Sequence, residues 1–187
     1  MYAELLEDMQ TENILKKLEM SHFYIKNMNK RIILVGPTAS GKNYIREKFR
    51  EKGYKIDVSY TTRQPRKGEA EGIDYQFIST TKFVDMIANC EFYEHVQYGD
   101  CYYGTGQFEW DMCEIFIMET DGVSHIAPED RKDCLVIYVN TPFDARLRRM
   151  RERGWDGQKI LERTKIDIEK FHNFKDYDLE ISSEQNS

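Results

Sequence analysis

The stretch Arg31-Ile-Ile-Leu-Val-Gly36-Pro-Thr-Ala-Ser-Gly41-Lys42-Asn43 decides how this chain folds. Its first five residues form a short, largely β-branched run that ends in glycine, which predicts a buried strand. Apolar residues then recur at near-helical spacing from Tyr44 to Lys52, and Gly53 is expected to end this helix. A strand, a Gly-rich loop and a helix in this order predict a phosphate-binding loop, because backbone N–H groups and the positive helix end meet the phosphates.

The residues expected to contact phosphates share this loop and the first turn of the helix, and they are Gly36, Thr38, Ala39, Ser40, Gly41, Lys42 and Asn43. A Cβ at either glycine would block the tight backbone path, and Lys42 would reach the outermost phosphates. The match to G-x-x-x-x-G-K-[ST] is incomplete, because Asn43 stands where a hydroxyl should face Mg²⁺. An ordinary Gly-rich turn therefore stays open as the alternative interpretation.

Composition indicates one folded domain with an acidic surface. The chain has 187 residues, 32% of them charged, a net charge of −6 and a pI near 5.4. We therefore expect neither broad nucleic-acid nor membrane-surface binding. Four cysteines and four histidines are scattered without zinc spacing, so we expect reduced thiols and a cytoplasmic protein. No signal peptide and no membrane span are expected.

The middle of the chain reads differently from its two ends. Short strands are expected at 55–60, 72–79 and 91–98, with a helix from Ser79 or Thr80 to about Asn89. This Tyr-rich, strand-dominated part predicts an inserted lobe. The Thr-Thr-Arg63-x-x-Arg66 segment after the first of these strands suits an anion clamp, although a solvated turn would have a similar composition.

The later part returns to buried strands and helices. We expect a central parallel strand at 113–118, buried strands at 135–139 and 178–182, and helices that begin near Thr141 and Ile160. Glu119 and Asp121 follow the first of these strands, where open α/β sheets bind their ligands. An amphipathic helix is expected within residues 1–27, and residues 183–187 are expected to form a loose tail.

Taken together, these motifs resemble those of guanylate kinases over about residues 28–182. In order they are Gly36-Pro-Thr-Ala-Ser-Gly-Lys42, Ser59-Tyr-Thr-Thr-Arg63-x-x-Arg66, Gly72-x-Asp-Tyr75, Phe92-Tyr-Glu94, Tyr102-Tyr103-Gly104-Thr105, Glu119-x-x-Gly122 and Arg153-Gly154. The order of the motifs, rather than any single one, makes the resemblance specific.

The resemblance implies an α/β fold: a P-loop NTPase-type parallel sheet core, an inserted mixed α/β lobe for the nucleoside monophosphate, and a helical lid. The core would comprise residues 28–59 and 108–182, with the lid at about 143–164 and the acceptor lobe at 60–107. The implied activity is transfer of the ATP γ-phosphoryl group to GMP, and to dGMP, with Mg²⁺ bound to ATP. A monomer and a homodimer both remain open.

The resemblance also implies a role for each site residue. Arg63, Arg66, Tyr75 and Tyr103 would hold the GMP phosphate. Glu94 would accept hydrogen bonds from guanine N1–H and the exocyclic amine, Thr105 would donate to O6, and Glu119 would add a base contact in place of the family's usual Asp. The catalytic set would be Lys42, Arg63, Arg153 and Arg163, the last two being lid arginines.

The sequence departs from the family pattern at four places. Asn43 replaces the metal-side hydroxyl, although its amide oxygen could ligate Mg²⁺ directly or through water. Ile117 stands where the family usually has an Asp, the segment 106–112 is short, and the usual C-terminal helix is missing. We expect the N-terminal helix to cover the surface that this last omission exposes. A kinase with an altered acceptor and a catalytically silent, guanylate-kinase-like binding domain remain the alternatives.

Overall fold

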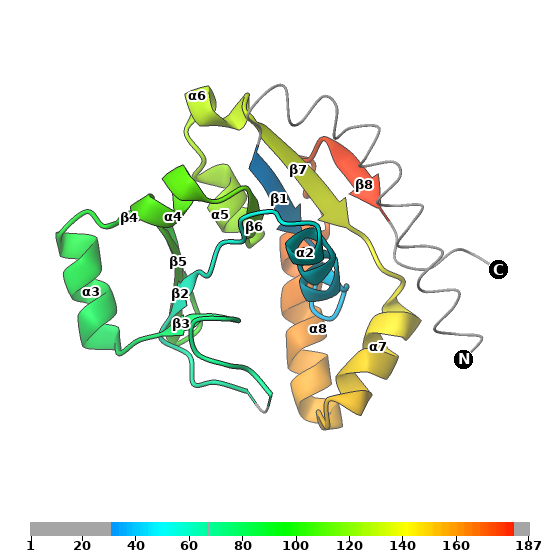
Figure 1. Cartoon of the computed structure of the whole chain (residues 1–187). Helices are drawn as coiled ribbons and strands as arrows, with labels where there is room; N and C mark the ends of the chain where they lie inside the picture. Colours follow the sequence, from blue (N-terminus) through cyan, green and yellow to red (C-terminus); the bar gives the residue numbers. More distant parts are fainter. Residues whose placement is uncertain (1–30, 67, 182–187) are drawn as a thin grey trace.

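The structure is a computed structural model that describes residues 31–66 and 68–181 (Figure 1). A four-stranded parallel sheet has the order β6-β1-β7-β8. Its strands are β1 (Arg31–Val35), β6 (Ile115–Ile117), β7 (Cys134–Val139) and β8 (Leu179–Ile181). The strands expected near 31–35, 135–139 and 178–182 are thus confirmed, each within a residue or so of its expected bounds.

Helices cover both faces of this sheet because its strands alternate apolar side chains to either side. Ile32 and Leu34 of β1 pack with Ile45 and Phe49 of helix α2 (Lys42–Glu51). The opposite face, through Ile33 and Val35, packs against short helices and the end of a long one. These helices are α4 (Gln107–Met112), α5 (Thr120–Ser124) and α8 (Gly157–Phe171).

A second sheet lies beside the first and contains the Tyr-rich segment (Figure 1, left). Its order is β3-β2-β5-β4, mostly antiparallel, with a parallel pair between β2 and β3. The strands are β2 (Tyr60–Thr61), β3 (Gln76–Phe77), β4 (Phe92–Tyr98) and β5 (Cys101–Gly106). Helix α3 (Thr80–Ala88) packs on it through Phe83, which stacks on Phe92 at 4.4 Å between ring centroids. Of the two residues expected to begin this helix, Ser79 is its N-cap, since the Ser79 side chain accepts from the Lys82 N–H.

Three strand predictions are wrong in extent or place. Residues 55–60 do not form a continuous strand, because only Ile56 pairs with Ile115 before the chain turns into the second sheet at β2. Residues 72–79 shorten to β3, because a turn at 72–74 with Gly72 at φ +71° interrupts the alternation. The strand that was expected to be central, β6, is an edge strand of the sheet. Its outer side carries only the bridge between Ile115 and Ile56 among the described residues.

Two further helices flank strand β7 along the chain. Helix α6 (Pro128–Arg131) precedes β7, and α7 (Phe143–Glu152) follows it. Helix α8 begins at Gly157 rather than at Ile160, because the Asp156 side chain accepts from the Lys159 N–H and caps an earlier start. In the described part of the chain, no helix is long and apolar enough to cross a membrane. The predicted N-terminal helix and the C-terminal tail lie outside the described residues.

Candidate active site

The loop between β1 and α2 follows a tight path at the carboxyl ends of the parallel strands. A Cβ on Gly36 would lie 2.6 Å from the carbonyl oxygen of Val139, so the loop fits against β7 only with glycine there. Gly41 has φ +101°, and Ala39 also adopts the left-handed region at φ +62°. A loop of this kind before a helix N-terminus offers backbone N–H groups to an anion.

Lys42 is the first residue of α2 and lies folded back onto this loop. Its Nζ donates to the carbonyl oxygens of Gly36 at 2.5 Å and Pro37 at 3.1 Å. Burial of the ammonium lowers its pKa from 10.5 to about 8, and the charges of Glu119 and Asp167 oppose that shift. The charge of Lys42 is therefore held at the loop rather than in solvent.

Residues after β7 anchor the second half of the loop. The Thr141 hydroxyl donates to the Ser40 carbonyl at 2.7 Å, in a buried contact. Nη1 of Arg149, on α7, donates to the Ala39 carbonyl at 3.1 Å. Both bonds engage carbonyl oxygens of the loop rather than its N–H groups.

The first half of the loop is anchored to α8. The Asp167 carboxylate accepts from the Thr38 N–H and the Thr38 hydroxyl, both at 3.0 Å. The same carboxylate pairs with Arg146 of α7 at 2.9 Å. Nε of Arg163 donates to the Thr38 hydroxyl oxygen at 2.9 Å.

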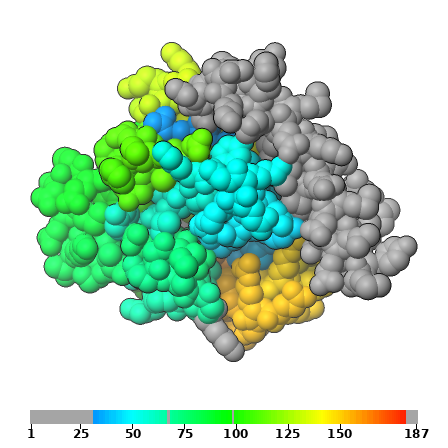
Figure 2. Space-filling model, viewed as in Figure 1, coloured from blue at the N-terminus to red at the C-terminus, as the bar shows by residue number. Residues whose placement is uncertain are grey.

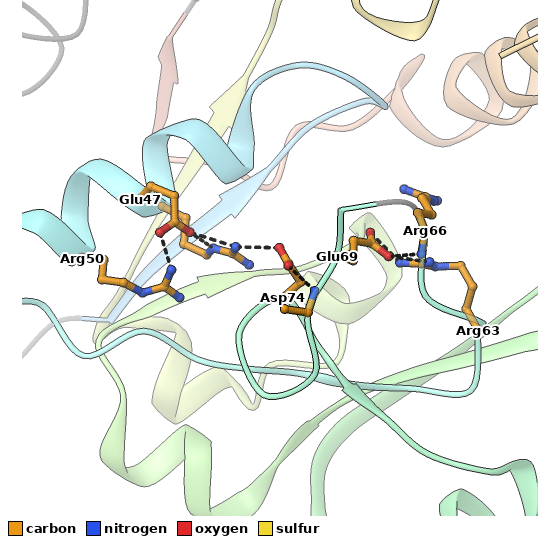
Figure 3. A network of polar contacts seen from close by, with 8 residues as sticks. Glu47, Arg50, Arg63, Arg66, Glu69 and Asp74 are labelled. Carbon is orange, nitrogen blue, oxygen red and sulfur yellow. Dashed lines mark hydrogen bonds and ion pairs between the residues drawn. The ribbon is translucent and has the colours of Figure 1, made fainter. Parts of the chain in front are cut away.

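A second group of cations lies in the lobe formed by the smaller sheet. The Arg63 guanidinium makes two parallel hydrogen bonds to Glu69 at 2.9 and 3.0 Å, and the Arg66 N–H donates to the same carboxylate at 2.7 Å (Figure 3). The Tyr75 ring lies 5.4 Å from Arg63 Cζ and 6.1 Å from the Tyr103 ring. Burial raises the pKa of Tyr75 to about 12, so at neutral pH its hydroxyl remains a donor. Two guanidiniums and two phenols thus face one small region, which is suited to an anion.

A buried carboxylate lies on β4 of the same lobe. Glu94 accepts from the Thr105 hydroxyl at 2.8 Å through Oε1. Its Oε2 is buried and has no hydrogen-bond partner among the described residues. A Cβ on Gly122 would lie 3.1 Å from that oxygen, so the glycine leaves room beside it. Burial raises the pKa of Glu94, as expected for a carboxylate with few partners.

The lobe and the α7–α8 segment approach each other. Arg66 Cζ lies 5.6 Å from the ring centroid of Trp155, which connects α7 and α8. In Figure 2 the teal surface of the lobe borders the orange surface of this helical segment. Burial lowers the pKa of Arg153, at the end of α7, and the charge of Arg149 lowers it further. Cations from both sides therefore gather around the region between the lobe and the phosphate loop.

Comparison with known proteins decides the family. A profile of the guanylate kinase family matches residues 28–186. A guanylate kinase of Latilactobacillus sakei is 30% identical over 172 residues, which cover 86% of this chain and 84% of that protein. Another, from Clostridioides difficile, is 33% identical over 166 residues, or 82% and 79% of the two chains. The chain belongs to the guanylate kinase family.

A solved structure agrees with this guanylate kinase fold. The crystal structure of guanylate kinase from Anaplasma phagocytophilum is similar with a TM-score of 0.61 and 23% identity, covering 83% of this chain and 77% of that one. The α/β fold with a parallel sheet, predicted from the sequence, is confirmed.

The structure brings most of the predicted guanylate kinase residues into three groups. The phosphate loop lies with Lys42 and Arg163, the lobe collects Arg63, Arg66, Tyr75 and Tyr103, and Glu94 pairs with Thr105. Glu119, the N-cap of α5, lies 3.6 Å from Lys170 and acts electrostatically on both Lys42 and Tyr75. The roles of these residues remain predictions.

Two of the residues that depart from the family pattern, Asn43 and Ile117, lie in different surroundings. Asn43 is exposed in the first turn of α2, one residue after Lys42. Ile117 packs against the apolar cluster of β1 and α2, and there is no carboxylate at that place. No group of three or more His, Cys, Asp or Glu residues in the described ranges could hold a metal ion.

Besides Thr141 and Arg149, which anchor the phosphate loop, three residues of the site were not predicted from the sequence. Glu69, three residues after Arg66, accepts the two hydrogen bonds of the Arg63 guanidinium. Asp167 and Arg146 form a buried ion pair beneath the loop. The spacing of four between Arg163 and Asp167 places both on one helix face, and this was the available signal for Asp167.

Proposed function

We propose that this chain is a guanylate kinase that transfers the γ-phosphoryl group of ATP to GMP, giving ADP and GDP. Its membership of the family supports this activity. The observation that carries the proposal most directly is the buried Glu94–Thr105 pair beside an arginine–tyrosine cluster, in a lobe separate from the phosphate loop. One site would take the donor phosphates, and the other a guanine base with its phosphate.

The Glu94–Thr105 pair suits guanine by its hydrogen-bonding pattern. Guanine presents two adjacent donors, N1–H and the exocyclic amine, next to the O6 acceptor. The Glu94 carboxylate would accept from the donors, and the Thr105 hydroxyl, which now donates to Glu94, would turn to O6. Adenine would place an unprotonated N1 against the carboxylate, and a buried acceptor without a donor is costly. Since none of these contacts involves the ribose, dGMP is also proposed as an acceptor.

The remaining residues would hold and neutralise the phosphates. The GMP phosphate would be bound by Arg63, Arg66, Tyr75 and Tyr103. It would replace Glu69 as the acceptor of the two hydrogen bonds from the Arg63 guanidinium. Glu119 would add a contact to the base. The phosphate loop, from Gly36 through Thr38, Ala39, Ser40 and Gly41 to Lys42, would bind the ATP phosphates. Phosphoryl transfer needs alignment and charge neutralisation rather than a covalent nucleophile.

Lys42, Arg63, Arg153 and Arg163 would supply this neutralisation. They come from the loop, the lobe and the α7–α8 segment, so an approach of these parts would surround the transferred group with positive charge. Mg²⁺, bound mainly by ATP, would neutralise further charge, with the Asn43 amide oxygen as the one ligand proposed from the chain. We also propose a cytoplasmic location, which the free state of all four cysteines supports.

The test is an acceptor panel. Coupled ADP formation from MgATP would be measured with GMP, dGMP, AMP, CMP and UMP. We expect turnover with GMP and dGMP alone, and a kcat/KM for GMP that falls about 100-fold in Glu94→Gln, because the new amide meets guanine donors with a donor. Turnover with AMP equal to that with GMP would refute the assignment of the acceptor. Measurable GMP binding without turnover for any acceptor would favour a silent binding domain.

A further inference from the structure

The hydroxyl of Thr38 lies between two residues of one helix face. Arg163 and Asp167 are four residues apart on α8, and both reach the same oxygen. Nε of Arg163 donates to Thr38 Oγ1 at 2.9 Å, and Thr38 Oγ1 donates to Asp167 Oδ1 at 3.0 Å. The hydroxyl therefore connects a lid arginine to a carboxylate.

Asp167 is held so that it can only accept. Its side chain is 7% exposed, and Oδ2 takes the Thr38 N–H at 3.0 Å and Arg146 Nη1 at 2.9 Å. Three donors, one of them the paired Arg146 guanidinium, fix the plane of this buried carboxylate. The only role left to the Thr38 hydroxyl proton is donation to Oδ1, which turns a lone pair of the hydroxyl toward Arg163.

The fixed lone pair of the Thr38 hydroxyl orients the Arg163 guanidinium through the hydrogen bond at Nε. A guanidinium is planar, so a hydrogen bond at Nε sets the direction of the whole plane, including both terminal nitrogens. The charge of Arg163 acts on Lys42, which places the guanidinium within the field of the phosphate loop. An arginine oriented before substrate arrives loses less side-chain entropy when it binds phosphate.

We propose that Asp167 is a positioning residue, which acts through the Thr38 hydroxyl to hold Arg163 over the phosphate loop. The contact orients a cation for the transition state and does not itself touch substrate. Arg146 supports it by neutralising Asp167. This inference rests on the proposed kinase activity, and it adds two residues, Asp167 and Arg146, that the family pattern did not supply.

The kinetic test uses a matched pair of variants. Thr38→Val removes the hydroxyl but keeps the shape and the N–H bond to Asp167, whereas Thr38→Ser keeps the hydroxyl. We expect kcat for GMP phosphorylation to fall about 10- to 100-fold in the valine variant, and we expect the serine variant to rescue most of this loss. In an Arg163→Ala background, Thr38→Val should cause no further loss, because the residue through which it acts is gone.

A second measurement does not depend on activity. The Nε–H proton of Arg163, assigned by its absence in Arg163→Lys, should exchange slowly with water in wild type and in Thr38→Ser. It should exchange rapidly in Thr38→Val and in Asp167→Ala. An exchange rate that is the same in all four proteins would overturn the contact.

Two kinetic results would overturn the positioning role, and a third result would separate it from the proposed function. Equal kcat in wild type and Thr38→Val, or losses that multiply in the Arg163→Ala background, would overturn the positioning role. A protected Arg163 proton in a wild type without GMP-dependent turnover would refute the proposed function, and with it the catalytic role of the contact.

Discussion

Replacement of Lys42 by methionine tests the electrostatics of the phosphate loop in isolation from catalysis. Burial lowers the pKa of Lys42 from 10.5 to about 8, so the folded state binds this proton less tightly than the unfolded state does. At 1.36 kcal/mol per pKa unit, holding the ammonium in the loop reduces stability by about 3 kcal/mol well below pH 8. This loss is relieved as pH rises from 8 to 10.5, because the folded state then releases the Lys42 proton while the unfolded chain still binds it.

The sign and size of the pH dependence follow from the same two pKa values. Between pH 7 and pH 9 the wild type should become more stable by about 1 kcal/mol relative to Lys42→Met, with the gap changing further toward pH 10. Comparison of the two proteins cancels the titration of other groups, provided that they respond alike. The assay is urea unfolding of both proteins at pH 7, 8 and 9.

Either of two results would refute this reasoning. A stability difference that is the same at all three pH values would mean that the Lys42 pKa is not lowered. A wild type that loses stability relative to Lys42→Met as pH rises would mean that the loop favours the charged form. The activity should depend on the protonation of the same group. The kcat/KM for ATP should fall above about pH 8, because Lys42 then loses its proton in the enzyme without substrate.

Three other predictions concern single positions. Gly36→Ala should destabilise the protein by about 2 kcal/mol in thermal or urea unfolding, because its Cβ would lie 2.6 Å from the Val139 carbonyl oxygen, and a wild-type melting curve would contradict this. Arg146→Met should cost about 3 kcal/mol by leaving Asp167 buried without its cation, and Arg146→Met combined with Asp167→Leu should recover most of that loss. GMP affinity, measured by calorimetry, should weaken as pH falls through the raised pKa of Glu94, since only the carboxylate accepts from guanine, and Glu94→Gln should abolish this pH dependence.

The sequence predicted the parts of the fold that have a strong local pattern. The run from Arg31 to Val35 forms the expected strand, and a Cβ on Gly36 would block the loop as expected. Gly41 is required by its φ of +101° rather than by a blocked path, and Ser79 is the cap among the two predicted candidates. The strand predicted at 55–60 was wrong because this segment passes from one sheet to the other. Ile56 pairs with the core sheet while Tyr60 pairs with the smaller one.

The candidate site was predictable where family motifs mark it, and not where pairing depends on tertiary contacts. The Arg63 and Glu94 motifs are short and ordered in the chain. Asp167 contacts Thr38 across 129 positions, and apart from its spacing of four from Arg163 no local pattern indicates this contact. The partner of a buried charge is chosen by the packing of helices on the sheet, and a single sequence does not show that packing.

The most direct test of the central claim is GMP-dependent ADP formation from MgATP, measured for the wild type beside Lys42→Ala and Asn43→Ser. The account predicts turnover in the wild type, its loss in Lys42→Ala by about 100-fold or more, and an increase in Asn43→Ser, where a hydroxyl restores a ligand for Mg²⁺. Absence of turnover in both the wild type and Asn43→Ser, with GMP still bound, would contradict the assignment of this chain as an active guanylate kinase.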